Sequence, residues 1–175
     1  LSLHDALPIL GNVSLDYYKS VGILLERSEA HESNRNVVIE PEKTDTTDGK
    51  GNPLYASDTS VAVSIEDPYA GIRSIEWSVN ASYDTGNNRN GIVTVDNNGA
   101  ISDEAWKITS ADRNLITGVS GQIPVFHNSN DIVVNVKVTD CAGNVTEKAV
   151  TISIDKTAPE ISISYNDIAP DSIYT

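Results

Sequence analysis

The 175-residue sequence contains no methionine and a single cysteine, and both shortages carry information. Because methionine is missing, we expect that Leu1 is not the natural start of the protein. With Cys141 alone, no internal disulfide can form, so the fold has to be held by its hydrophobic core. A catalytic cysteine needs a neighbouring histidine as base, and nothing in the sequence places His127, the one candidate, near Cys141. We therefore predict no thiol chemistry.

Basic residues are also scarce. Twelve lysines and arginines stand against 25 acidic residues, which gives a formal net charge of −13 at pH 7. Nucleic-acid binding depends on clustered lysine and arginine that face phosphate, so this balance argues against a nucleic-acid partner. No apolar stretch approaches the roughly 18 residues that a membrane-spanning helix needs. We expect a soluble extracellular surface and no membrane insertion of this fragment.

Sequence signatures of catalysis are missing as well. The chain contains no HExxH, GxSxG, phosphate-binding-loop or CxxC motif. Acidic residues are so plentiful that a pair of carboxylates by itself indicates nothing specific. We therefore expect that the protein is not an enzyme and needs no cofactor.

The first nine residues do not resemble part of a protein fold. Residues 1–9, LSLHDALPI, resemble the translation of a common sequencing-library adapter. Such a segment is set aside in fold reasoning, as a cloning scar would be. We expect residues 1–9 to be non-native.

Strand periodicity is the dominant pattern in the rest of the chain. In residues 131–140, Ile132, Val134, Val136 and Val138 alternate with polar residues, which predicts a strand with one buried and one wet face. Further strands are expected over residues 36–40, 61–66, 75–79, 91–95, 116–125 and 149–154. About seven short strands separated by turn residues predict an all-β, antiparallel β-sandwich.

Three local features refine this prediction. Trp77 falls on a strand at a position where a core tryptophan would pack between the two sheets. Pro124 favours an edge or a bend for the strand at residues 116–125, because proline cannot donate to a sheet ladder. Residues 102–114 are expected to include one helical turn.

A short internal repeat suggests how the chain is divided. Gly11-Asn12-Val13-Ser14 matches Gly143-Asn144-Val145-Thr146, and each copy is followed by an apolar run, a polar linker and a new strand. We therefore expect residues 10–35 to be the last strand and linker of a preceding repeat. Residues 36–156 are then one complete domain, and residues 157–175 begin the next. A chance match with an N-terminal extension on a single domain remains the alternative.

Two segments carry a family resemblance. Residues 138–144, VTDCAGN, are followed by residues 152–159, ISIDKTAP. Together they resemble the D-x-A-G-N turn, last strand and D-x-T-A-P linker of bacterial immunoglobulin-like domains in multi-repeat, adhesin-like cell-surface proteins. Residues 67–76, DPYAGIRSIE, resemble another segment of these domains, whereas Cys141 stands where the family usually has a polar residue. The resemblance implies an immunoglobulin-like sandwich, tandem repetition, a bacterial cell-surface or secreted location and a spacer or adhesive role.

Oxygen donors near the expected strand ends suggest calcium as a ligand. Calcium takes six to eight oxygen ligands, often from loops that meet at one pole of a domain. Ordinary turn chemistry and solvated acids explain the same residues without a metal. The calcium candidates are Glu66, Asp67, Asp140, Asn144 and Asp155.

Two further kinds of site are weighed against simpler interpretations. Trp106 and Tyr83 fall in loop-like segments and are candidates for stacking on sugars, although a buried Trp106 that covers one edge of the sandwich is the simpler expectation. An intramolecular Lys–Asn isopeptide bond would need a buried lysine, and Lys137 falls on the outward face of its strand.

Two main functions remain open at this point. The first is a non-catalytic structural spacer or adhesion module, whose expected partners are adjacent immunoglobulin-like repeats and a host or cell-wall glycan or protein. The second is an accessory, carbohydrate-binding module attached to a secreted glycan-degrading enzyme. A calcium-dependent interaction domain is a third, weaker hypothesis. The sequence of the full gene would distinguish the first two hypotheses.

Overall fold

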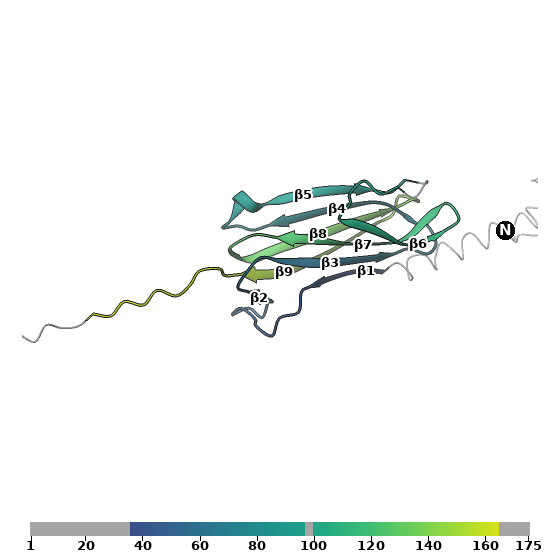
Figure 1. The fold of residues 1–175 in the computed structure, drawn as a ribbon. Helices are drawn as coiled ribbons and strands as arrows, with labels where there is room; N and C mark the ends of the chain where they lie inside the picture. The colour runs from purple at the N-terminus through teal and green to yellow at the C-terminus, as the bar shows by residue number, and fades with distance from the viewer. Residues whose placement is uncertain (1–35, 97–99, 165–175) are drawn as a thin grey trace, which may run out of the picture.

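The computed structural model describes residues 36–96 and 100–164, and the nine strands in these residues form two sheets packed face to face (Figure 1). The strands are β1 (Asn36–Pro41), β2 (Leu54–Tyr55), β3 (Thr59–Glu66), β4 (Ile72–Asn80), β5 (Arg89–Thr94), β6 (Trp106–Asp112), β7 (Leu115–Val125), β8 (Ser129–Asp140) and β9 (Val145–Ile154). A 3₁₀ turn, η1 (Thr85–Asn87), lies between β4 and β5. The described residues contain no helix long and apolar enough to cross a lipid bilayer.

The first sheet has the strand order β1-β3-β7-β6, and all its neighbours are antiparallel. β3 is central, with Val61 paired to Ile123 of β7 on one side and to Pro41 of β1 on the other. The second sheet has the order β2-β9-β8-β4-β5. Its pairs are antiparallel except for the two-residue β2, which runs parallel to β9.

The core lies between the sheets and consists largely of valine and isoleucine. These β-branched side chains fit the pleated surface of a sheet, and full burial of each contributes about 1.5–3 kcal/mol. The alternation predicted for β8 is confirmed, since Ile132, Val134 and Val136 are 0% exposed and Val138 is 2% exposed. The same alternation buries Val61, Val63 and Ile65 of β3 and Ile152 and Ile154 of β9.

The strand order identifies the sandwich. Lettered in chain order with β2 as A′ and β5 as C′, the first sheet reads A-B-E-D and the second reads A′-G-F-C-C′. An immunoglobulin domain places strands A, B, E and D in one sheet and C, F and G in the other. The predicted fold class, an all-β immunoglobulin-like β-sandwich, is therefore confirmed. The sandwich occupies residues 36–154, and the predictions for residues 1–9 and 10–35 lie outside the described residues.

Of two local predictions, one was wrong and one holds at the residue that prompted it. Residues 102–114 contain no helical turn, because most of this segment is β6, which turns at Arg113 and Asn114 into its antiparallel partner β7. The edge expected at Pro124 is present locally, although β3 and β6 flank β7 as a whole. Pro124 is tolerated because the pairing of β6 with β7 begins only at Gly121, so Pro124 lies beyond that ladder. Residues 155–164 form no strand, so the new strand expected after the linker is absent from the described residues.

The strand ends define two poles. At the N-terminal pole, β1 begins at Asn36, which pairs with Glu66 at the end of β3, and β8 turns into β9 at residues 141–144. At the C-terminal pole, β9 ends at Ile154, which pairs with Ser129 at the start of β8. The described chain therefore enters the sandwich at one pole and leaves it at the opposite pole (Figure 1).

Candidate functional site

The calcium candidates are divided between the two poles. Glu66, Asp67, Asp140 and Asn144 lie at the N-terminal pole, whereas Asp155 follows β9 at the C-terminal pole, where its N–H donates to the carbonyl of Tyr55 at 2.9 Å. Asp67 is 2% exposed, and its Oδ1 accepts from the amides of Tyr69 at 3.2 Å and Ala70 at 3.0 Å. Asp67 and Asp140 therefore share a pole, whereas Asp155 lies at the opposite one.

Asp140 braces the turn from β8 into β9. Its carboxylate accepts from the backbone amide of Asn144 at 2.8 Å and from the Asn144 side-chain amide at 2.9 Å. Backbone bonds link Asp140 with Asn144 and with Gly143, whose φ of +93° suits glycine. This is a three-residue hairpin loop with glycine at its left-handed position.

The geometry thus matches the simpler explanation of the acidic residues, that they stabilise turns. Among the described residues, no three histidine, cysteine, aspartate or glutamate side chains are close enough together to hold a metal ion. Calcium binding at this pole stays a hypothesis, and its test is whether calcium or a chelator changes the thermal unfolding temperature.

A second copy of this turn lies near the C-terminal pole, and sequence reasoning missed its equivalence. Asp48 accepts from the backbone amide of Asn52 at 2.9 Å and from its side-chain amide at 3.0 Å, and Gly51 has a φ of +87°. The backbone bonds between Asp48, Gly51 and Asn52 repeat those of the first turn. The shared signal is D-x-x-G-N, which residues 48–52 and 140–144 both carry.

The Asp48 turn makes two long-range side-chain contacts with the second sheet. The hydroxyl of Ser153, which is 0% exposed on β9, donates to Asp48 Oδ2 at 2.7 Å. This bond, together with the donors from Asn52, holds the pKa of Asp48 well below its usual range. Lys50 in the same turn pairs with Asp131 at 2.5 Å, which raises the pKa of Lys50. The turn is therefore fastened to the second sheet.

The two candidates for sugar stacking lie in opposite environments. Trp106 is 3% exposed, and a Cβ on Gly121 would come within 2.4 Å of its ring, so the ring lies directly across that glycine. A ring in this position presents no face to a sugar, and Trp106 closes the β6 side of the core instead. Tyr83 is 87% exposed and lies between β4 and η1 at the C-terminal pole.

Trp77 has the role expected from its strand. It is partly buried, packs against the core, and lies across Gly91 of β5, where an added Cβ would come within 2.6 Å of the ring. Trp77 and Trp106 therefore have the same arrangement in the two sheets: each ring covers a glycine of the adjacent strand. Since β5 and β6 are the last strands at one side of their sheets, both rings seal that side of the sandwich.

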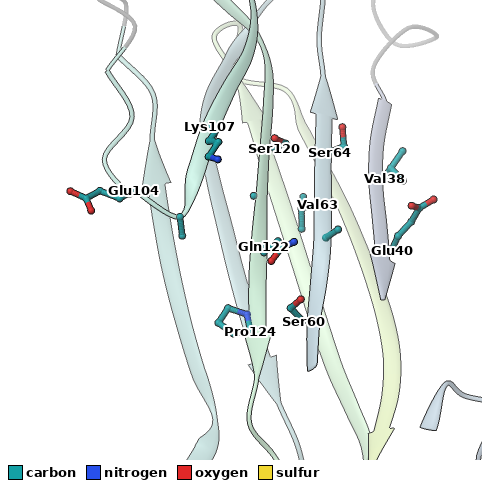
Figure 2. Close-up of a pocket in the computed structure, with 13 residues that line it drawn as sticks. Val38, Glu40, Ser60, Val63, Ser64, Glu104, Lys107, Ser120, Gln122 and Pro124 are labelled. Atoms are coloured by element: carbon teal, nitrogen blue, oxygen red, sulfur yellow. The ribbon is translucent and has the colours of Figure 1, made fainter. Parts of the chain in front are cut away.

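A trough of about 750 Å³ runs along the outer face of the first sheet (Figure 2). Its floor consists of small side chains, including those of Ser60, Ala62 and Ser120, and Glu40 and Lys107 lie at its margins. None of the 13 residues that line it is aromatic. The trough therefore lacks the stacking platform that sugar binding would use.

The structure also shows where the residues of the thiol and isopeptide hypotheses lie. Cys141 is exposed in the turn at the N-terminal pole, and burial of the thiol together with nearby Asp140 raises its pKa, which disfavours a reactive thiolate. His127 lies at the opposite pole, after β7. Lys137 is 40% exposed and pairs with Glu76 at 2.9 Å on the outer face of the second sheet. An isopeptide bond would need a buried lysine.

The C-terminal pole contains a buried histidine. His127 is 0% exposed, and its Nε2 lies 3.1 Å from Asn88 Oδ1. Because Asn88 Oδ1 also accepts from the amide of Ala81 at 2.8 Å, it acts as an acceptor, and Nε2 must be the protonated nitrogen. Nδ1 has no hydrogen-bond partner among the described residues.

The surroundings of His127 disfavour its charged form. Burial lowers its pKa, the positive charges of Arg89 and Lys156 lower it further, and Asp84 opposes them. Asp84 itself accepts from the amide of Asn128 at 2.8 Å, which lowers the pKa of Asp84. Arg89 stacks over the Phe126 ring at 4.3 Å and donates to the carbonyl of Pro124. The surroundings therefore favour the neutral imidazole in the folded protein.

Three residues beyond the last strand are held against this pole. The amide of Lys156 donates to Asn128 Oδ1 at 2.9 Å, and the Asn128 side-chain amide donates to Thr157 Oγ1 at 3.3 Å. Lys156 Nζ donates to the carbonyl of Phe126 at 2.9 Å and pairs with Asp58. Lys156 and Thr157 are thus hydrogen-bonded to the turn between β7 and β8, and Asp155 is hydrogen-bonded to Tyr55 of β2.

No protein-family model and no curated protein matches the sequence. Similar solved structures include a DUF4466 family protein from Parabacteroides merdae, with 9% identity over 68% of this chain, 44% of that chain and a TM-score of 0.34. The BIgI domain of beta protein from S. agalactiae, bound to CEACAM1 in its structure, has 16% identity over 71% of this chain, 100% of that chain and a TM-score of 0.36. A structure on T cell specificity and activation by toxic shock syndrome toxin-1 contains a third, with 8% identity over 68% of this chain, 99% of that chain and a TM-score of 0.36.

These likenesses are too distant to indicate a function. The chain spans less than half of the Parabacteroides merdae protein, at 44% of its length. The assignment of the fold rests on the strand order of the two sheets, which the topology gives directly.

Proposed function

We propose that this protein is a non-catalytic spacer or adhesion module of a bacterial cell-surface or secreted protein, standing in a row with further immunoglobulin-like repeats. One observation carries the proposal: β1 begins at one pole, and β9 ends at the opposite pole. Domains connected in this way extend end to end, so each added copy lengthens the row.

The segment after the sandwich supports a following repeat. Ile161 and Ile163 are 86% and 90% exposed and alternate with Ser162 and Ser164. Val37 and Ile39 alternate in the same way in β1, where they face the core. Residues 160–164 have the pattern of a first strand whose remaining strands would follow, and residues 157–175 are thus proposed as the start of the next repeat.

The strand geometry also suits a mechanical role. Tension on the two ends would pull β1 and β9 along their own lengths, because the chain enters and leaves at opposite poles. β1 is held by six residue pairs to β3, and β2 is paired in parallel with the end of β9. Pulling along a ladder loads its hydrogen bonds together, whereas pulling across its end would break them one at a time.

Single-molecule force measurements on the chain held by its two ends test the proposal. We expect one abrupt unfolding event that lengthens the chain by on the order of 400 Å. Val38→Pro, which removes a backbone donor from β1, should lower the unfolding force. Ile92→Pro on β5, outside the loaded strands, is the matched control and should leave the force closer to that of the parent chain. Gradual extension without an abrupt event would argue against a load-bearing spacer.

The accessory carbohydrate-binding alternative now depends on Tyr83. Its ring is 87% exposed, whereas Trp106 is buried. A glycan array decides this alternative: binding that Tyr83→Ala abolishes would favour a carbohydrate-binding accessory module. Binding that persists in Tyr83→Ala would have to use another surface.

A further inference from the structure

The C-terminal pole combines a fixed chain exit with an open hollow. Lys156 and Thr157 are hydrogen-bonded to Phe126 and Asn128, and Asp155 is hydrogen-bonded to Tyr55, so the direction in which the chain leaves the sandwich is set by this domain. Beside the exit lies a hollow of about 320 Å³. Its lining residues are Tyr83, Asn128, Ser129, Asn130, Ile154, Asp155 and Thr157.

Two aromatic side chains lie exposed at this pole. Tyr83, on the rim of the hollow, is 87% exposed, and Phe126 is 43% exposed on the turn that holds Lys156. The turn that carries Phe126 is held in place, because Arg89 stacks on the Phe126 ring and the next residue, His127, is buried. An exposed aromatic on an anchored turn is a low-entropy contact surface.

The chain length restricts what can occupy the hollow. After the docked Thr157, only Ala158 and Pro159 precede Glu160, so the Cα atoms of Thr157 and Glu160 are at most roughly 11 Å apart. Pro159 also fixes one backbone dihedral of this short connection. A repeat that begins at residue 160 would therefore have to stand directly over the hollow.

We propose that this surface, the hollow together with Phe126, is a seat for the immunoglobulin-like domain that follows in the same chain, and that residues 155–157 orient that domain. The inference rests on the proposed function and deepens it, since it names the surface through which neighbouring repeats contact each other. Without a seat, a connection of a few residues would let adjacent domains swing, and a row of them would bend freely.

The docked exit can be tested in the 175-residue chain by backbone amide hydrogen exchange. We expect the amide of Lys156 to exchange at least about tenfold more slowly than that of Ile163, after correction for intrinsic rates, because the first donates to Asn128. Asn128→Ala should remove this protection, whereas Asn130→Ala, at the start of β8, should keep it. Equal exchange at Lys156 and Ile163 in the parent chain would overturn the proposal.

The seat itself is tested in a tandem chain in which a second copy of residues 36–164 follows Pro159. Spin labels are placed at Cys141 of the first copy and at an Ile92→Cys site of the second copy, whose own Cys141 is changed to alanine. Both positions are exposed and lie away from the joint. We expect a narrow distribution of label separations that Tyr83→Ser in the first copy broadens at least about twofold. Val145→Ser, at the far pole of the first copy, should leave it unchanged.

The outcomes separate this inference from the proposed function. A long but broad distribution in the parent tandem, or a narrow one that Tyr83→Ser does not alter, overturns the seat and leaves the spacer role standing. A short average separation, with the two copies folded back side by side, contradicts the spacer role itself.

Discussion

The two poles of the sandwich are stabilised in different ways. At the N-terminal pole, the carboxylates of Asp67 and Asp140 accept hydrogen bonds from amides at most four residues away along the chain. At the C-terminal pole, Ser153 bonds to Asp48 across 105 residues and His127 to Asn88 across 39. Backbone bonds also join distant segments at the N-terminal pole, from Asp67 to Thr117 at 2.8 Å and from Cys141 to Gly71 at 3.1 Å, so the difference lies in the side chains, which reach distant segments at the C-terminal pole.

The two poles therefore differ in how much of the chain must be folded before their side-chain bonds can form. A local turn needs only its own few residues, so its bonds can form whenever the adjoining strands pair. The contacts of the C-terminal pole exist only when β4, β5, β7, β8 and β9 are all in place, because each partner comes from a different segment. The direction of the chain exit therefore depends on the folding of the whole sandwich.

The largest expected effect comes from removing the acceptor at the centre of the C-terminal pole. Asn88→Ala leaves the amide of Ala81 and Nε2 of His127 without an acceptor, and both groups belong to buried residues. Loss of these two bonds should reduce the free energy of unfolding by about 2–3 kcal/mol. Urea denaturation measures this change in the free energy of unfolding.

Two substitutions serve as comparisons for Asn88→Ala. Asn87→Ala removes only exposed bonds to Asp84 and should cost less than about 0.5 kcal/mol. Asn144→Ala at the N-terminal pole removes one side-chain bond but keeps the backbone bond to Asp140, so its cost should stay below about 1 kcal/mol. Similar costs for Asn88→Ala and Asn144→Ala would remove the distinction between the poles.

Acid should weaken the C-terminal pole first, through His127. Burial lowers the folded-state pKa of His127 below 6.5, so near and below pH 6.5 the unfolded chain binds a proton that the folded protein does not. Stability is therefore complete above pH 6.5 and falls as the pH drops toward the folded-state pKa. The slope is at most about 1.4 kcal/mol per pH unit, the value for a single proton.

The contribution of His127 is isolated by comparing pH profiles of stability. His127→Gln should flatten the profile just below pH 6.5, whatever its effect on stability at pH 7. Asp48 and Asp84, whose pKa values are lowered in the folded protein, contribute stability that is lost only as the pH falls below the ordinary aspartate value of 3.8. A profile that His127→Gln leaves unchanged would show that the histidine is not responsible.

The Asp48 and Asp140 turns allow a further comparison, in which the expected loss of stability is smaller and the same at both poles. Gly51 and Gly143 have φ values of +87° and +93°, and an added Cβ would meet no atom within 4 Å at either position. Alanine at either site should therefore cost only backbone strain, about 1 kcal/mol, and equally at both poles. Gly86→Ala, which has open space and no positive φ, is the control and should be close to neutral. Unequal costs at Gly51 and Gly143 would mean that the surroundings alter the turn.

Sequence alone predicted what is local in this molecule. The alternation in β8 and the Asp140 turn follow from residues within about ten positions of each other, and both are present. The helical turn expected in residues 102–114 failed because pairing with β7 fixes β6, and that pairing depends on the whole sheet. The bonds of His127 and Lys156 could not be predicted, since they arise only after the strand register brings distant segments together. The equivalence of the Asp48 and Asp140 turns was predictable, because both carry D-x-x-G-N.

The smallest effect is expected at Cys141, the exposed thiol of the N-terminal pole. The Asp140 turn is held by bonds from the backbone and from Asn144, none of which uses the cysteine side chain. Modification with a small maleimide should therefore shift the free energy of unfolding by less than about 0.5 kcal/mol. Because burial and Asp140 raise the thiol pKa above 9.0, the modification rate should still be rising with pH at pH 9. A plateau below pH 9 would show that the thiol pKa is not raised, and marked destabilisation by the adduct would show that the turn depends on the cysteine side chain.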